Sequence, residues 1–137
     1  MVSLIDNTYM DTARIFAKLS KAKRLKVGSV LVKDGRIISC GYNGCVAGGS
    51  NDCEYEMDGK LTTKSEVIHS EANAILWAAK TGTATKNCHL YTTISPCFEC
   101  CKMIIQAGII RVVFIDTYRN IEGLKFLQDN NIIVERI

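Results

Sequence analysis

Apolar residues near the start of the chain follow first a helical and then a strand-like pattern. Four of them share one face at helical spacing, which predicts an amphipathic helix over 6–20. They are Tyr9, Ala13, Phe16 and Ala17. Two β-rich runs follow at 27–32 and 36–40, with Asp34-Gly35 between them. Because glycine accepts the positive φ of a tight hairpin turn, this stretch predicts a β-hairpin.

The second half of the chain alternates regularly between helical and strand patterns. It is preceded by residues 41–66, which are rich in Gly, Asn and Ser and are expected to form a long, functional loop. The elements predicted after this loop are helix 70–80, strand 89–94, helix 97–107, strand 109–115, helix 121–129 and strand 132–134. Strands joined through helices predict a layered α/β domain in which 109–115 and 132–134 run parallel.

Length and composition favour one globular domain over residues 1–137. Of the 137 residues, 47% are hydrophobic, which is enough to bury a substantial core. No run approaches the roughly 20 apolar residues of a membrane-spanning helix. The N-terminal segment also lacks the basic and apolar regions of a signal peptide. We therefore expect a cytoplasmic protein with no membrane partner.

The charge and the cysteine content restrict the functions that the chain is expected to have. The net charge of +3 is too small to indicate nucleic-acid binding. The seven cysteines are an odd number, and in a chain without an export signal they argue against a disulfide framework. Metal binding is the better use for at least two of them.

Two short motifs combine in a pattern typical of catalytic zinc sites. His69-Ser70-Glu71 lies at the start of predicted helix 70–80, and Pro96-Cys97-Phe98-Glu99-Cys100 at the start of helix 97–107. One imidazole and two thiolates provide three zinc ligands and leave a fourth position open. His69 and Glu71 would diverge by about 200° within a regular helix. Both can face one ion only if His69 lies at the helix entry.

Each residue of these motifs has an expected role. We expect His69, Cys97 and Cys100 to hold one catalytic Zn²⁺, which activates a water by lowering its pKa. Glu71 is expected to carry protons as general acid and base. The same combination, H-x-E followed by P-C-x-x-C, is the signature of zinc-dependent nucleobase deaminases.

Spacing alone leaves other zinc arrangements open. Cys101 is one turn from Cys97, so it competes with Cys100 as the ligand. A structural zinc site closed by Cys101, Cys88 or His89 is an alternative, although it gives no purpose to Glu71. A second zinc site is a further alternative, and its ligands would be Cys45, Cys53, Cys88 and His89.

Three blocks of the sequence resemble the deoxycytidylate (dCMP) deaminases of the zinc-dependent cytidine deaminase superfamily. They are Gly41-Tyr42-Asn43-Gly44, residues 67–75 with the metal histidine, and residues 96–109 with the cysteine pair. The resemblance runs from about residue 17 to the end of the chain. The metal motif is shared by many deaminases, whereas the Gly-Tyr-Asn-Gly block followed by a long insertion is more particular to the dCMP branch.

This resemblance implies a fold and an activity. The fold is a three-layer domain in which helices flank a five-stranded mixed sheet. The activity is hydrolysis of dCMP to dUMP and ammonia. Members of the family are commonly homo-oligomers, often hexamers, activated by dCTP and inhibited by dTTP. Whether Mg²⁺ accompanies such a triphosphate is left open.

The resemblance also implies substrate-binding residues. Asn43 matches the position that contacts the sugar, although with Gly41 and Gly44 it could instead only form a tight turn. From its place just past predicted strand 109–115, Tyr118 is expected to close over the base or sugar, or else to be a partly buried aromatic residue at the rim. We also expect Ser70 to be a substrate-binding residue; the family usually has alanine at this position. Arg24 is our first choice for the phosphate because its segment leads into the first strand and arginine recognises phosphate well. The other candidates are Lys23, Lys26, Arg111 and Arg119.

A regulatory nucleotide loop is expected around Gly44, Gly48 and Gly49. Val46 stands there in place of the family's usual proline, which makes regulation less secure than the chemistry.

Two other functions compete with a free-nucleotide deaminase. A deaminase acting on cytosine or adenine in nucleic acid would track the backbone with basic and aromatic surfaces. Aromatic residues make up only 7% of this chain, and no run of Lys and Arg exceeds two residues. A catalytically silent zinc-binding protein would have little use for Glu71. We therefore expect a free nucleotide as the partner, and no nucleic acid.

Overall fold

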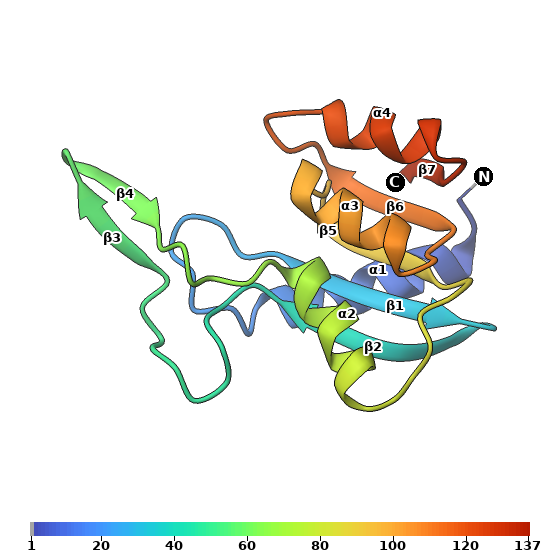
Figure 1. Ribbon diagram of the computed structural model, residues 1–137, viewed down its shortest axis with the longest axis horizontal. Coiled ribbons are helices and arrows are strands. Elements are labelled where there is room, and N and C mark those ends of the chain that lie inside the picture. Colours follow the sequence, from blue (N-terminus) through green and yellow to red (C-terminus); the bar gives the residue numbers. More distant parts are fainter. Residues whose placement is uncertain (1) are drawn as a thin grey trace.

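A five-stranded mixed sheet lies at the centre of the computed structural model, which describes residues 2–137 (Figure 1). Its strands occur in the order β2-β1-β5-β6-β7. Their bounds are Gly28–Lys33 for β1, Arg36–Tyr42 for β2, His89–Ile94 for β5, Arg111–Asp116 for β6 and Ile133–Arg136 for β7. β1 runs antiparallel to β2 and to β5, whereas β6 is parallel to both β5 and β7. The expected parallel pairing of the last two strands is confirmed.

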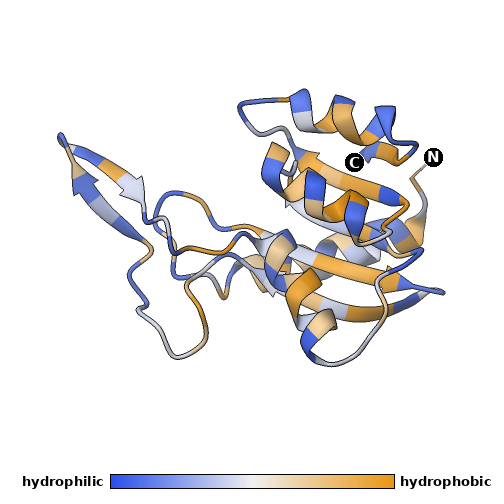
Figure 2. Cartoon of the chain, viewed as in Figure 1, coloured by the Kyte–Doolittle hydropathy of each residue, from blue (hydrophilic) through white to orange (hydrophobic). Residues whose placement is uncertain are grey.

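Helices cover both faces of this sheet and make three layers. α1 (Leu4–Ala17) lies on one face, and α2 (Ser70–Lys80), α3 (Phe98–Gln106) and α4 (Glu122–Asp129) lie on the other. Hydrophobic residues concentrate in the central strands (Figure 2). The core under α1 contains Tyr9, Met10, Ala13, Val30, Val32, Tyr91 and Val113. The larger core on the other face includes Leu31, Ala74, Ala78, Leu90, Cys101, Ile104, Val112 and Leu127. The expected α/β class is confirmed.

Most predicted elements form within a few residues of their expected bounds. Helix 70–80 and strand 89–94 match the structure, whereas the helix expected over 6–20 begins and ends earlier. Its start is set by a capping box, in which the Ser3 side chain accepts from the Asp6 amide and the Asp6 carboxylate accepts from the Ser3 amide. Within residues 2–137, no helix is both long and apolar enough to cross a membrane.

The stretch 41–66 is not the continuous loop that its composition predicts. It contains a second hairpin, β3 (Glu54–Met57) and β4 (Lys60–Thr63). Asp58 and Gly59 form its turn with φ values of 52° and 74°, close to the 49° and 74° of Asp34 and Gly35. The two Asp-Gly turns are therefore equivalent, and the second was overlooked because short, polar strands flank it.

This second hairpin projects away from the body of the molecule (Figure 1) and is tied to it at its base. The Glu54 carboxylate accepts hydrogen bonds from the backbone amides of Lys23 and Arg24 at 2.8 and 2.9 Å. Arg24 in turn donates from its guanidinium to the Thr63 hydroxyl at 3.0 Å. The base of the hairpin thus rests on the segment that leads into β1.

The start of α2 lies directly on β2 because Gly41 has no side chain. A Cβ at this position would lie 2.4 Å from the Ser70 carbonyl oxygen and 2.7 Å from the Ala74 amide nitrogen. Two residues earlier, the Ser39 hydroxyl donates to the Ala74 carbonyl at 2.6 Å. The close approach at Gly41 sets how near α2 lies to β2, and the Ser39 hydrogen bond adds a contact further along the helix.

A buried ion pair joins α1 to the sheet. Arg111 binds Asp6 through two hydrogen bonds of 2.7 and 3.1 Å, and its Nε donates to Glu135 at 2.8 Å. The exposed fractions of Asp6 and Arg111 are 4% and 8%. Arg111 begins β6, at the opposite end of the parallel strands from their carboxyl termini. It is therefore a structural residue, and its candidacy as a phosphate ligand is wrong.

This ion pair predicts an acid-sensitive contribution to stability. The Arg111 guanidinium holds the pKa of the Asp6 carboxyl well below its usual range. A depressed carboxyl pKa stabilises the fold above the unfolded-state pKa of about 4, and this stabilisation is lost as pH falls toward the folded-state value. The free energy of unfolding of the wild type should therefore fall more steeply between about pH 5 and pH 2 than that of Asp6→Asn.

Urea unfolding at several pH values measures this difference. At neutral pH, Asp6→Asn should cost about 3 kcal/mol, because one partner of a buried pair is removed. Asp11→Asn is the matched control, since Asp11 pairs with Arg14 on the exposed side of the same helix, and it should cost less than about 1 kcal/mol. Identical pH slopes for the wild type and Asp6→Asn would contradict the prediction.

Candidate functional site

Two helix N-termini meet at one end of the sheet. His69 is the N-cap of α2, with φ −68° and ψ 155°, and Cys97 is the N-cap of α3, with φ −70° and ψ 167°. Both residues are thus extended and lie just outside their helices. Pro96 precedes Cys97, and Cys100 lies in the first turn of α3. The expectation that His69 sits at the helix entry is confirmed.

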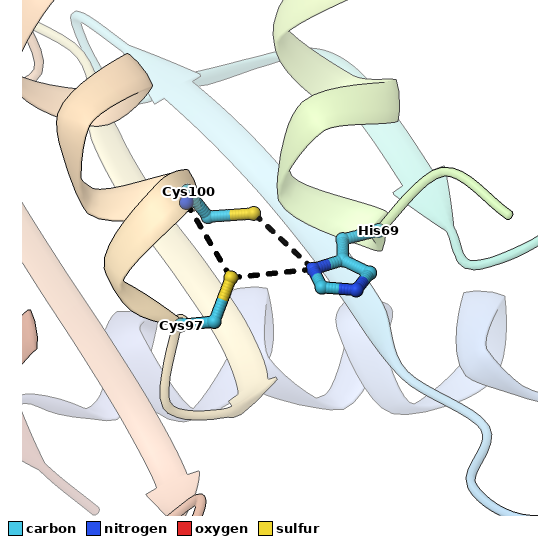
Figure 3. A group of neighbouring side chains, drawn as sticks. All are labelled: His69, Cys97 and Cys100. Carbon is cyan, nitrogen blue, oxygen red and sulfur yellow. Dashed lines mark hydrogen bonds between the residues drawn. The ribbon is translucent and has the colours of Figure 1, made fainter. Parts of the chain in front are cut away.

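The side chains of His69, Cys97 and Cys100 converge (Figure 3). Nδ1 of His69 lies 3.4 Å from Sγ of Cys97 and 3.5 Å from Sγ of Cys100. All three atoms are within 4.8 Å of one another. His69 is exposed, Cys97 half-buried and Cys100 buried, so the cluster opens toward solvent on the histidine side.

These distances fit a tetrahedral zinc ion. Zinc binds histidine nitrogen at roughly 2.0–2.1 Å and cysteine sulfur at roughly 2.3 Å, so tetrahedral angles place the nitrogen and sulfur atoms about 3.6 Å apart. The observed separations of 3.4 and 3.5 Å are close to this value. The protein supplies three ligands, as in catalytic zinc sites.

The electrostatics of the cluster also favour a cation. A hydrogen bond from Cys100, aided by His69, holds the pKa of Cys97 at about 4. The same contact raises the pKa of Cys100, because a second thiolate beside the first is disfavoured. Two thiolates can therefore coexist here only with positive charge between them. Zinc supplies that charge, and its binding displaces the remaining thiol proton.

The structure separates Cys100 from its competitor Cys101. Cys101 is fully buried in the core between α2, α3 and the sheet, and its thiol points to the Pro96 carbonyl at 3.8 Å. Cys88 is likewise part of this core. Within residues 2–137, the only cluster of metal-ligating side chains is the one formed by the two motifs. Neither the four-ligand structural site nor the second zinc site is assembled among them.

Glu71 lies beside the zinc ligands and is held by hydroxyl groups. Its exposed fraction is 4%, yet it lines the cavity that His69 and Cys97 also line. Its Oε1 accepts hydrogen bonds from Thr92 at 2.9 Å and from Ser70 at 3.1 Å. Ser70 lines the cavity too, but its hydroxyl is buried and bonds within the protein. The Ser70 hydroxyl therefore contacts Glu71, and a contact between Ser70 and the substrate stays a prediction.

The cavity in front of the zinc ligands gathers residues from five parts of the chain. It is lined by Leu25, Val27, Asn43, Thr63, Val67, His69, Ser70, Glu71, Ile94, Ser95, Cys97 and Tyr118. Asn43 and Tyr118 were expected from the sequence. The apolar wall and Thr63 were missed, because Leu25 and Val27 carry no motif and Thr63 belongs to the overlooked hairpin. Recognising the second Asp-Gly turn would have pointed to Thr63.

Asn43 shapes the wall of the cavity. Its Oδ1 accepts from the Val27 amide at 2.8 Å, and its Nδ2 donates to the Leu25 carbonyl at 2.8 Å. An amide has two N–H groups and two lone pairs, so each end retains one for a ligand. Asn43 can therefore hold the wall and contact a sugar at the same time.

Two of the candidate phosphate ligands lie near the cavity. Arg24 donates to Thr63, which lines it. Arg119 stacks over the ring of Tyr118 at 5.5 Å from the centroid. The amide of Tyr118 also donates to the Ser95 hydroxyl at 2.6 Å, which holds this loop against the end of β5.

A second cavity lies beside the first. The expected loop residues Gly44, Gly48 and Gly49 line it, together with Lys21 and Tyr42. Asn43 lines both cavities, so the loop and the zinc-side cavity share a wall.

Comparison with known proteins agrees with this geometry. Residues 4–116 match the family described as the cytidine and deoxycytidylate deaminase zinc-binding region. The deoxycytidylate deaminase of Enterobacteria phage T4 is 33% identical over 151 residues, covering 82% of this chain and 78% of the phage protein. The human deoxycytidylate deaminase is 39% identical over 118 residues, covering 82% of this chain and 65% of the human protein.

A solved structure extends the similarity to the whole fold. The dCMP deaminase of cyanophage S-TIM5, crystallised in complex with dCMP and dUMP, matches with a TM-score of 0.93 and 40% identity. The match covers 100% of this chain and 99% of the phage protein. The family match and the convergent donor set agree that His69, Cys97 and Cys100 form a zinc site.

Neighbouring cysteines provide a direct test of the ligand set. Cys100→Ala should reduce the zinc content from about one ion per chain to near zero, because one of three protein ligands is lost. Cys101→Ala should keep the zinc and lose only about 1 kcal/mol of unfolding free energy from a small cavity. Elemental analysis of the purified variants measures the metal, and the reverse pattern would assign the ligand to Cys101.

Proposed function

The chain belongs to the cytidine and deoxycytidylate deaminase family, and from this membership we propose that it hydrolyses dCMP to dUMP and ammonia. The observation that carries the proposal is one cavity lined by zinc ligands and a buried glutamate. The match to a dCMP deaminase in complex with dCMP and dUMP supports the choice of substrate. We further propose that residues 1–137 act as a single domain.

The reaction exchanges an amino group for an oxygen. Zinc, when held by His69, Cys97 and Cys100, lowers the pKa of a coordinated water and so makes a nucleophile available near neutral pH. Glu71 accepts a proton from the attacking water and delivers it to the ring nitrogen N3 of cytosine. It then moves the second water proton to the departing amino group, which leaves as ammonia. The carbon–oxygen bond at C4 replaces the carbon–nitrogen bond.

The remaining cavity residues bind and orient the nucleotide. The side chains of Leu25, Val27 and Ile94 offer an apolar wall to the base. The free hydrogen-bonding positions of Asn43 suit a sugar hydroxyl. Tyr118 also lines the cavity; its backbone amide is held by the Ser95 hydroxyl, and Arg119 lies over its ring.

Arg24 is our choice for the phosphate. Its guanidinium already reaches Thr63 at the edge of the cavity, and an arginine has five N–H donors, so further bonds to phosphate oxygens are available. Arg119 is the alternative, since it stands beside Tyr118.

We also propose that nucleotides regulate the enzyme and that its subunits form a homo-oligomer. We propose that dCTP activates and dTTP inhibits by binding, with Mg²⁺, at the cavity lined by Gly44, Gly48 and Gly49. A homo-oligomer, with a hexamer favoured, follows from the family resemblance. Sedimentation analysis with and without each nucleotide tests the subunit number, and the deamination assay in their presence tests regulation.

Substrate preference and the role of Glu71 are tested together. The purified zinc-loaded protein should release ammonia from dCMP much faster than from deoxycytidine, CMP or cytosine in single-stranded DNA. Glu71→Ala should retain its zinc but lose turnover by at least about 10³-fold, because the proton carrier is removed. Faster deamination of the oligonucleotide would replace the proposed substrate, and full activity in Glu71→Ala would remove the proposed mechanism.

The proposed contact between Arg24 and the substrate phosphate can be tested separately, by comparing substrates with and without a phosphate. Arg24→Ala should raise KM for dCMP by about tenfold or more, because a charge-assisted hydrogen bond is lost. The rate with deoxycytidine, which has no phosphate, should change little. Arg36→Ala, at the turn between β1 and β2, is the control and should leave both substrates unaffected. If Arg119→Ala instead gives the selective loss, the phosphate ligand is Arg119.

A further inference from the structure

Three buried hydroxyl groups form a continuous chain around the glutamate. Ser29, Ser70 and Thr92 each have an exposed fraction of 0%. Ser29 and Thr92 lie directly opposite each other in the β1–β5 register, below the start of α2. The Ser29 and Ser70 oxygens are 2.7 Å apart, and both Ser70 and Thr92 reach Oε1 of Glu71.

The direction of this chain follows from counting protons. Each hydroxyl has a single proton to donate. Ser70 donates its proton to Glu71 at 3.1 Å, so within the Ser29–Ser70 pair Ser70 must accept and Ser29 must donate. The Thr92 hydroxyl lies 2.9 Å from the same carboxylate oxygen, but its one proton can serve only one acceptor at a time. Its other neighbouring acceptor is the carbonyl of Ile94 at the end of β5.

The effect of these bonds is to fix the orientation of the carboxylate. The terminal torsion of a glutamate side chain is soft and has no sharp preference of its own. Here Oε1 is held between a hydroxyl from α2 and one from β5, both on rigid elements. The plane of the carboxylate is thereby set, and both hydroxyls bond the same oxygen of this cavity-lining residue, not its second oxygen, Oε2.

We propose that Ser29, Ser70 and Thr92 are positioning residues, which hold Oε1 of Glu71 so that Oε2 faces the reacting atoms. The proposal rests on the proposed function, in which Glu71 transfers protons. Proton transfer requires the donor and acceptor at hydrogen-bond distance, and small misplacements of a catalytic group reduce the rate strongly. The three hydroxyls are buried and bond within the protein, so we expect the positioning to act on kcat and not on KM.

Conservative variants test the proposal. Thr92→Val removes one hydroxyl at almost constant shape and should lower kcat by about tenfold. Ser70→Ala introduces the residue that the family usually has at this position, and should lower kcat by a smaller factor, about threefold. KM for dCMP and zinc content should stay near the wild-type values. Thr92→Ser keeps the hydroxyl and should restore most of kcat. Ser39→Ala is the matched control, since Ser39 is also buried but donates to the Ala74 carbonyl on the same helix.

Two kinetic results would overturn the proposal. One is an equally low kcat for Thr92→Ser and Thr92→Val, which would show that shape and not the hydroxyl matters. The other is a loss in Ser39→Ala as large as in Ser70→Ala, which would indicate a general effect on α2. A Ser29→Ala variant with a smaller loss than Ser70→Ala supports the proposed order of the chain, because Ser29 acts through Ser70.

A crystal structure of the zinc-loaded Ser70→Ala/Thr92→Val variant gives a readout independent of turnover. The carboxylate of Glu71 should be rotated or disordered there and well ordered in the wild type. An unchanged carboxylate would contradict the proposal even if activity fell. If the wild type does not deaminate dCMP, the proposed function fails, but the crystallographic comparison still decides whether the hydroxyls position Glu71.

Discussion

The zinc site depends on close packing that brings two helix starts together within the reach of one metal ion. His69 and Cys97 cap different helices, and three donor atoms must lie within 4.8 Å of one another for the site to exist. The bare backbone of Gly41 lets α2 sit close on β2 and sets the position of the first helix. The buried Cys101 and Ile104 anchor the second helix in the shared core. Packing on one face of the sheet therefore determines the zinc geometry.

Within residues 2–137, the two buried carboxylates, Asp6 and Glu71, have different partners. Asp6 is paired with Arg111, so it remains an anion and ties α1 to the sheet. Glu71 lies at the other end of the strands, and none of the ion pairs among residues 2–137 involves it. Hydroxyl groups, and no cationic side chain, bond Glu71. The carboxylate is thereby held in one orientation beside the zinc ligands, which suits a proton carrier.

The sequence alone predicted the features that depend on residues close together in the chain. The H-x-E and P-C-x-x-C motifs located the zinc ligands, and the geometric conflict between His69 and Glu71 placed the histidine at the helix entry. Spacing could not separate Cys100 from Cys101, because the choice depends on which side of α3 faces the core. The substrate wall was not foreseen, since Leu25 and Val27 reach the cavity only through the tertiary hydrogen bonds of Asn43. The burial of Arg111 likewise depends on contacts with α1.

During folding, the metal site can form only late. Its histidine and first cysteine are 28 residues apart, and β5 runs between the two helices that carry them. The helix caps face one another only after β5 has paired with β1, whose residues come from a distant part of the chain. Small zinc fingers fold around their ion and are unfolded without it. Because the site here joins distant elements of a larger core, we expect the scaffold to form first and the zinc to bind to an already folded chain.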